Sequence, residues 1–421
     1  MAQQPLPVGA LKRIRVLFVA EAVTLAHVAR PLALGIALDP ACYEIFFACD
    51  QRYRHFVDNP HWFFRSLRSI SSQRFLQALA QGSPVYDAET LRDHVREDLG
   101  LIDEIKPDVI VGDFRLSLSV SARCRKIPYI AITSAYWSAY SARLDFPLPV
   151  LPMTRFMPIA AARFLFALSR RAAFAYHTVP LNRIRREYGL PSLGLDLRRI
   201  YTDADRVLFA DVPELFPTIN LPSTHHYLGP VLWSPPVPKP PWWDALPQQR
   251  PIVYVTLGSS GMVKLLPELL EALSALQVTV IAATAGVSLA KSYSDHVFTA
   301  DYLPGSEAAA RAALVICNGG SPTSQQALAA SVPVLGIAGN MDQFLNMDAV
   351  VHSGAGVLIR ADRVSVGGIR AAVTHLISSP EYAQAAASLA QIFTRYPARD
   401  RFAAIVADTI GSAASQGINT G

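Results

Sequence analysis

The stretch that decides the fold is ALVICNGGSPTSQQALAASVPVLGIAGNMDQFLNMDAVVHSGAG, residues 313–356. Its apolar start predicts a buried strand that ends at Asn318, where two glycines let the backbone come close to a ligand. Ser321 or Thr323 then opens a helix, and Pro322 in the first turn supports that assignment. The amides and the helix dipole at such a turn favour phosphate. The stretch therefore predicts an anion site between a strand and a helix.

Strands and helices alternate on both sides of this stretch. We expect strands over residues 15–20, 44–49, 109–111, 129–133, 252–257, 279–283, 297–300, 313–317 and 334–337. We expect helices over residues 28–38, 91–105, 116–126, 265–276 and 321–330. Alternation of this kind predicts an α/β fold with parallel sheets covered on both faces, and it places binding sites at the carboxyl ends of the strands.

The chain divides at a proline-rich segment. WSPPVPKPPWWDALP, residues 233–247, holds six prolines in fifteen residues, which favours an extended connector. A length of 421 residues also favours two domains with a cleft between them. The domains that we expect are an N-terminal domain at 1–232, a linker at 233–249, a C-terminal domain at 250–395, and a helix with a tail at 396–421.

The composition excludes several protein classes. With 51% apolar and 17% charged residues, the chain is neither disordered nor collagen-like. The four cysteines show no zinc-site or CxxC spacing, so we expect reduced thiols, no disulfide and a cytoplasmic location. No apolar run reaches the length of a membrane span, about 18 residues. A net charge of +5 without interleaved basic and aromatic residues argues against nucleic acid as a partner.

Basic residues gather in residues 155–200, which hold nine arginines and two acids. FPLPVLPMTRFMPIAAARFLFALSRRAAFAY, residues 146–176, is also rich in apolar side chains. This pattern predicts an apolar ligand. The arginines fit either peripheral contact with anionic lipid on the cytoplasmic face of a membrane, or a core helix whose charges are solvated. The sequence leaves both interpretations open.

An ordered set of motifs resembles the nucleotide-sugar-dependent glycosyltransferases of the GT-B fold, in particular the macrolide and UDP-glucuronosyl/glucosyl transferase group. The set consists of Asn318-Gly319-Gly320-Ser321-Pro322-Thr323, then Ser331-Val332-Pro333, then Asp342-Gln343 and Asn346. The resemblance spans the whole chain. It implies two Rossmann-like parallel-sheet domains that face a central cleft, with the acceptor held by the N-terminal domain and the nucleotide sugar by the C-terminal domain.

The resemblance also implies a donor site. VYVTLGSSG, residues 253–261, matches the family's strand and small-residue loop at the diphosphate, and DYLP, residues 301–304, matches a turn beside the base. The expected donor-binding residues are Gly258, Ser259, Ser260, Tyr302, Asn318, Gly319, Gly320, Ser321, Thr323, Gln326, Asp342 and Gln343. The chain departs from the family at three of its positions: Asn318 replaces a histidine, Gln326 a glutamate and Gly305 a glutamine.

Two residues of the N-terminal half are the expected catalytic pair. The run from His27 to Pro31 resembles the family's Gly-His-Val-x-Pro, with Ala26 as a further departure in place of the glycine. In that family the histidine is the base that deprotonates the acceptor hydroxyl. A neutral imidazole suits that task. Asp113, at the end of a predicted strand, stands where the family has the acid that orients the base.

The resulting expectation is an inverting hexosyltransferase that needs neither a metal nor a cofactor. It would move a sugar from a UDP- or dTDP-sugar to a hydroxyl of a hydrophobic small-molecule or lipid acceptor.

An alternative function is that of a non-catalytic, nucleotide-sugar-binding or partner-activating relative of the family, which the departures at Asn318 and Gln326 leave open. A dehydrogenase is disfavoured because no GxGxxG follows a predicted strand. A sugar-nucleotide epimerase would need more acidic and basic groups around the sugar.

Overall fold

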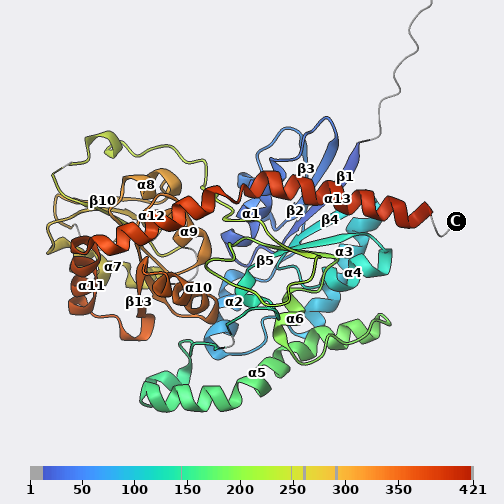
Figure 1. Ribbon diagram of the computed structural model, residues 1–421, viewed down its shortest axis with the longest axis horizontal. Helices are drawn as coiled ribbons and strands as arrows, with labels where there is room; N and C mark the ends of the chain where they lie inside the picture. Colours follow the sequence, from blue (N-terminus) through green and yellow to red (C-terminus); the bar gives the residue numbers. More distant parts are fainter. Residues whose placement is uncertain (1–12, 144, 248, 259–261, 290–292, 419–421) are drawn as a thin grey trace, which may run out of the picture.

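The computed structural model describes residues 13–143, 145–247, 249–258, 262–289 and 293–418. It confirms the α/β class: a seven-stranded and a six-stranded parallel sheet form two domains, each covered by helices (Figure 1).

The first sheet has the strand order β3-β2-β1-β4-β5-β6-β7. Its strands are β1 (Ile14–Ala20), β2 (Tyr43–Cys49), β3 (Trp62–Ser66), β4 (Val109–Asp113), β5 (Tyr129–Thr133), β6 (Arg206–Phe209) and β7 (His225–Tyr227). The helices of this half are α1 (Leu25–Gly35), α2 (Ser72–Gln81), α3 (Ala88–Ile105), α4 (Leu118–Arg125), α5 (Ile159–Glu187) and α6 (Leu197–Tyr201).

The second sheet has the order β10-β9-β8-β11-β12-β13. Its strands are β8 (Ile252–Thr256), β9 (Thr279–Ala283), β10 (Val297–Ala300), β11 (Leu314–Cys317), β12 (Val334–Ala338) and β13 (Gly356–Arg360). The helices are α7 (Leu266–Ser274), α8 (Gly305–Arg311), α9 (Ser321–Ala329), α10 (Met341–His352), α11 (Val366–Ser378), α12 (Pro380–Thr394) and α13 (Ala398–Ile418). Short 3-10 segments lie at Gln51–Phe56, Ala135–Trp137, Pro152–Arg155, Trp243–Ala245, Met262–Leu265 and Ala361–Arg363.

Both sheets reverse their strand order at one point, and that point positions the site. In the first sheet β1 pairs with both β2 and β4, and in the second β8 pairs with both β9 and β11. Ligands of open α/β sheets bind beyond the carboxyl ends of the strands at such a reversal. The loops after β1, β4, β8 and β11 therefore define the place to search for chemistry.

The C-terminal helices connect the two halves. Helix α12 packs against α9 of the second domain, whereas α13 contacts α1 and β4 of the first (Figure 1). Phe402 and Val406 of α13 are fully buried in the same core as Phe18 and Phe47 of the first sheet. The last helix of the chain thus completes the core of the first domain.

Helix α1 begins earlier than the sequence pattern predicts. The expected range was 28–38, but the helix runs over Leu25–Gly35 and Thr24 is its N-cap. His27 therefore lies in the first turn of a helix and not in the preceding loop. The apolar periodicity that set the predicted boundary marks only the buried part of the helix, which begins at Val28.

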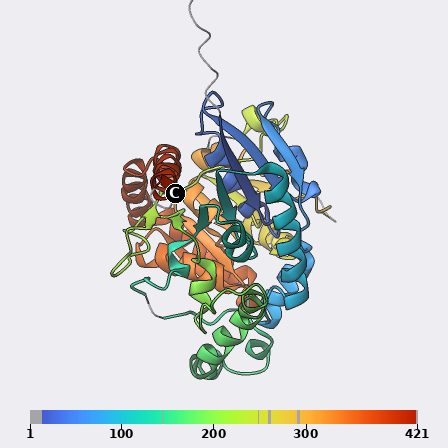
Figure 2. The same cartoon turned by 90° about the vertical axis from the view of Figure 1, so that its right-hand side faces the viewer.

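Helix α5 lies at the outer edge of the molecule in both views (Figure 1 and Figure 2). It is 29 residues long and contains Pro180. In the described part of the chain, every helix falls short of the apolar length that a membrane crossing requires.

Candidate active site

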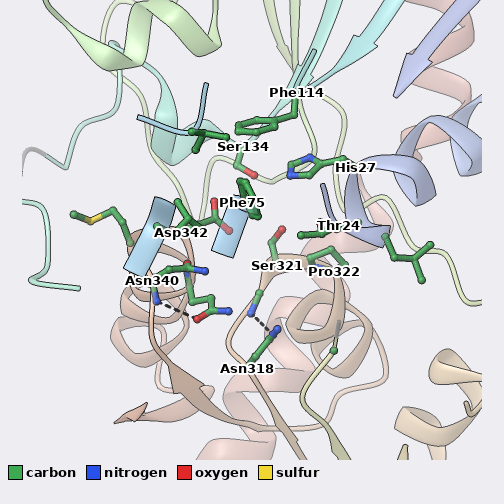
Figure 3. Close-up of a pocket in the computed structure, with 18 of the residues that line it drawn as sticks. Thr24, His27, Phe75, Phe114, Ser134, Asn318, Ser321, Pro322, Asn340 and Asp342 are labelled. Carbon is green, nitrogen blue, oxygen red and sulfur yellow. Dashed lines mark hydrogen bonds between the residues drawn. The ribbon is translucent and has the colours of Figure 1, made fainter. Parts of the chain in front are cut away.

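A cavity of about 1110 Å³ lies between the carboxyl ends of the two sheets. Its wall comes from both domains, with His27 and Phe114 on one side and Asn318 and Ser321 on the other (Figure 3). Because each domain supplies loops from its own strand-order reversal, two substrates bound in this cavity would meet between them.

His27 and Asp113 form the predicted pair. The Nδ1 atom of His27 lies 2.8 Å from Oδ1 of Asp113. Asp113 is fully buried at the end of β4, whereas the His27 ring is partly exposed at the cavity wall. When Nδ1 donates its proton to the carboxylate, Nε2 of the same ring is free to accept a proton. The pair therefore has the geometry of a general base and the group that orients it.

Arg30 also binds Asp113, which sequence reasoning missed. Its Nε donates to Oδ2 at 2.8 Å and its Nη2 donates to Oδ1 at 2.7 Å, so the contact is bidentate. Burial lowers the pKa of the Arg30 guanidinium, but the Asp113 carboxylate outweighs burial and holds that pKa above its usual value. The Nη2 atom of Arg30 is also 3.0 Å from Nδ1 of His27. Three residues, and not two, thus form one cluster, in which Arg30 and Asp113 are buried and His27 reaches the cavity.

The ring of Phe114 stacks on the ring of His27 and restricts its orientation. The two rings stack with centroids 4.7 Å apart and an interplanar angle of 17°. Phe114 also meets Phe75 edge-on and Tyr201 in a stacked arrangement. Its φ of 58° is rare for a bulky residue and is stabilised only by its surroundings. Such conformations concentrate at functional sites.

The turn after β11 lies on the opposite wall, as predicted. The side-chain oxygen of Asn318 accepts a hydrogen bond from the backbone N–H of Gly320 at 3.0 Å (Figure 3). Ser321 and Thr323 of the first turn of α9 line the cavity. The positive end of that helix therefore faces the cavity and favours a negatively charged ligand.

Gly319 is not part of the cavity wall. It has a φ of +78°, and a Cβ there would lie 2.7 Å from Cγ of Met347. The amide of Asn346 donates to the Gly319 carbonyl at 2.9 Å. Gly319 and Asn346 thus shape the turn from behind, whereas Asn318 and Gly320 line the cavity.

Asp342 and Gln343 lie in the first turn of α10, and their side chains have different hydrogen-bond partners. One carboxylate oxygen of Asp342 accepts from the hydroxyl of Tyr136 at 3.0 Å and from the indole N–H of Trp137 at 2.9 Å. Burial raises the pKa of Tyr136 well above its usual value, so its hydroxyl keeps the proton that it donates. The side-chain oxygen of Gln343 accepts from the backbone N–H of Gly339 at 2.8 Å and from that of the N-cap residue Asn340 at 3.2 Å, and the second of these contacts belongs to a capping box.

Three further predicted donor residues line the cavity: Gly258, Tyr302 and Gln326. The amide of Gln326 donates to the carbonyl of Trp233 and, at 3.3 Å, to the hydroxyl of Ser234. This residue therefore also anchors the segment between the domains. Ser259 and Ser260, which the sequence also indicated, lie outside the described residues.

The part of the cavity beyond His27 is apolar. Its wall includes Leu79 from α2, Phe166 and Phe174 from α5 and Tyr201 from α6. The sequence indicated only that residues 146–176 were apolar, because the other lining residues come from α2, α6 and loops that are distant from this segment in the sequence.

Asp211 and Gln325 link the two domains beside the cavity. The amide of Gln325 donates to Oδ1 of Asp211 at 3.1 Å, and the backbone N–H of Ala135 donates to Oδ2 at 2.7 Å. Burial raises the pKa of Asp211 to about 7.

Within the described residues, no three His, Cys, Asp or Glu side chains come together in a way that could hold a metal ion.

Comparisons with known proteins identify a family and several relatives of this chain. A family described as "Erythromycin biosynthesis protein CIII-like, C-terminal domain" matches residues 267–407. A "PGL/p-HBAD biosynthesis rhamnosyltransferase" of Mycobacterium bovis (strain BCG / Pasteur 1173P2) is 55% identical over 386 residues, which cover 92% of this chain and 86% of that protein. An "Inactive PGL/p-HBAD biosynthesis glycosyltransferase" of the same strain is 52% identical over 269 residues, 64% of this chain and 73% of its own length.

A solved structure shares the fold. "Spinosyn Rhamnosyltransferase SpnG complexed with thymidine diphosphate" superposes with a TM-score of 0.67 at 18% sequence identity, and the match covers 94% of this chain and 99% of that chain. At this identity the match establishes the two-domain architecture.

Proposed function

This chain belongs to the GT-B glycosyltransferases, and from that premise we propose that it transfers a sugar from a nucleoside diphosphate sugar to a hydroxyl of a hydrophobic acceptor, with inversion at the anomeric carbon. The observation that carries the proposal is the cavity in which the His27–Asp113 pair of one domain faces the first turn of α9 of the other (Figure 3).

In the proposed reaction His27 acts as the general base. Its Nε2 takes the proton of the acceptor hydroxyl while the acceptor oxygen forms a bond to the anomeric carbon of the sugar. The bond from that carbon to the diphosphate breaks on the opposite face, and the electron pair leaves with the diphosphate. Asp113 stabilises the imidazolium that results. Holding both substrates in one cavity removes much of the entropic barrier.

Negative charge that grows on the departing diphosphate would meet the first turn of α9. Ser321 and Thr323 lie there, and the Asn318 side chain keeps the preceding turn in place. Fixed amides and a helix dipole stabilise an anion without reorganisation. We propose that this electrostatic stabilisation makes a divalent metal unnecessary, which transfer in the presence of a chelator would test.

For the substrates, we propose rhamnose as the sugar and an acceptor with a large apolar part. The rhamnose proposal rests on the name of the 55% identical relative. The acceptor proposal rests on the apolar wall beyond His27, where Phe75 and Phe166 line the cavity. In this proposal Asp342, which Tyr136 and Trp137 orient, accepts hydrogen bonds from sugar hydroxyls.

A non-catalytic role is the second candidate, because one relative is named inactive. The intact hydrogen bond between His27 and Asp113 favours catalysis. A protein that binds a nucleoside diphosphate but transfers no sugar would support the second candidate.

The first experiment is a calorimetric titration of the purified chain with UDP and with dTDP, without added metal. We expect one of them to bind with a micromolar dissociation constant. Transfer is then measured with the matching rhamnose donor and an apolar alcohol or phenol as acceptor. His27→Ala is the control, because it removes the base and leaves the donor wall unchanged. Failure of both nucleotides to bind would contradict the proposal.

A further inference from the structure

The N-terminal half of α5, together with the turn before it, exposes large apolar side chains. Phe156 is 87% exposed, Phe164 68%, Leu165 45% and Leu168 67%. Most residues from 160 to 172 are exposed, and Ala162 and Phe166 are the buried ones. Exposed apolar side chains are normal when scattered, but a contiguous group of this size indicates a surface that contacts something apolar.

Helical spacing gathers these residues on one face. Phe164 and Leu168 are four residues apart, and Leu165 is three residues before Leu168, so their side chains are neighbours. We call Phe164, Leu165 and Leu168 the outer face of α5. Phe166 points the other way, since it is buried and lines the cavity. One helix therefore separates the acceptor part of the cavity from an apolar external surface.

Basic residues flank the outer face. Arg155, Arg163 and Arg171 form no salt bridge with any described residue, and the sequence has no Asp or Glu from 146 to 186. Arg163 and Arg171 are eight residues apart, so they lie near one side of the helix. Unpaired arginines beside an apolar strip have the charge that complements an anionic surface.

Three of the five arginines beyond this half form ion pairs within the protein. Arg183 pairs with Glu187, Arg185 with Asp203, and Arg198 with Asp196. The basic segment at 155–200 is therefore divided: Arg155, Arg163 and Arg171 in its first part form no salt bridge with a described residue, whereas three arginines of its second part are neutralised by internal ion pairs.

We propose that the outer face of α5 docks on an anionic lipid bilayer, with Phe164, Leu165 and Leu168 inserted at the level of the headgroups. The helix would lie along the surface, as interfacial helices do. Its inner face, through Phe166 and Phe174, lines the cavity at the same time. Docking would thus place the acceptor part of the cavity next to the membrane, from which an apolar acceptor could enter.

The test is sedimentation with phosphatidylcholine vesicles that contain or lack phosphatidylglycerol. This assay requires no sugar transfer, so its outcome is independent of the proposed function. We expect the chain to bind the anionic vesicles, and we expect added salt to release it. The combined variant Arg163→Gln/Arg171→Gln should weaken binding about twenty-fivefold, about fivefold for each arginine.

Two serine variants separate the outer face from other exposed apolar residues. Phe164→Ser/Leu168→Ser should abolish binding to the vesicles. Leu195→Ser is the matched control, because Leu195 is also 68% exposed but lies outside α5, and it should bind as the unmodified chain does. Arg186→Gln, at the far end of the same helix, is the control for charge.

Several results would overturn the proposal. These are absence of binding to anionic vesicles, equal binding of Phe164→Ser/Leu168→Ser and the unmodified chain, and loss of binding in the Leu195→Ser control. A dimer that dissociates in Phe164→Ser/Leu168→Ser would show that a second copy of the chain covers this face, and that result would also refute lipid docking.

Discussion

Replacing Asp113 with asparagine should destabilise the protein as well as inactivate it. Asp113 is fully buried and accepts hydrogen bonds from Arg30 at 2.8 and 2.7 Å and from His27 at 2.8 Å. The substitution would keep the size of the side chain but remove its charge, so the buried Arg30 guanidinium would lose its counter-ion. Breaking one partner of a buried ion pair costs about 3–5 kcal/mol of the free energy of unfolding.

A second substitution separates the two effects. Arg30→Met in the Asp113→Asn background removes the stranded charge and keeps an apolar side chain of similar length. Replacing both members of a buried pair is often nearly neutral for stability. We therefore expect the double variant to recover most of the free energy of unfolding, while sugar transfer stays low because His27 lacks its carboxylate.

The measurement is urea unfolding followed by tryptophan fluorescence, combined with a transfer assay. Arg65→Met is the control, because Arg65 forms an exposed ion pair with Glu104 and its loss should change the free energy of unfolding by at most about 1 kcal/mol. The reasoning would be refuted if Asp113→Asn were as stable as the unmodified protein. It would also be refuted if the double variant were no more stable than Asp113→Asn alone.

Three further predictions follow from the site. His27→Ala should lower the rate of transfer about 10²–10⁴-fold while calorimetry shows nucleoside diphosphate binding within about twofold of the unmodified chain, and equal loss of both would contradict the role of base. Gly319→Ala should lower the free energy of unfolding by about 1–3 kcal/mol, measured by urea denaturation, because its φ is +78° and its Cβ would press on Met347; unchanged stability would contradict this. The pKa of Asp211 is raised to about 7 by burial, so its stabilising contribution is full below the ordinary carboxyl pKa and is lost as pH rises through about 7. The stability of the unmodified chain relative to Asp211→Asn should therefore fall between about pH 4 and about pH 7 in urea unfolding, and a constant difference would show that Asp211 does not titrate there.

Some strands and helices can be predicted from the sequence more readily than others, and the difference has a physical cause. Apolar, β-branched strands such as Val109–Asp113 are buried on both faces, so their composition marks them. Trp62–Ser66 escaped notice because it is an edge strand of aromatic and polar residues that are mostly only partly buried. The N-cap of α3 at Asp87 was likewise missed, and that helix begins at Ala88, three residues before the expected 91.

The sequence by itself determined the α/β class, the division into two domains and the turn after β11, because these depend on local patterns of apolar residues, glycine and proline. Only the tertiary structure decided which groups meet. Arg30 and Asp113 are 83 residues apart, and Tyr136 and Asp342 are 206 apart. Such contacts depend on how the strand order and the packing of two domains bring loop ends together, which no local pattern encodes. The same holds for α5, whose inner and outer faces become distinct only when the cavity forms on one side of it.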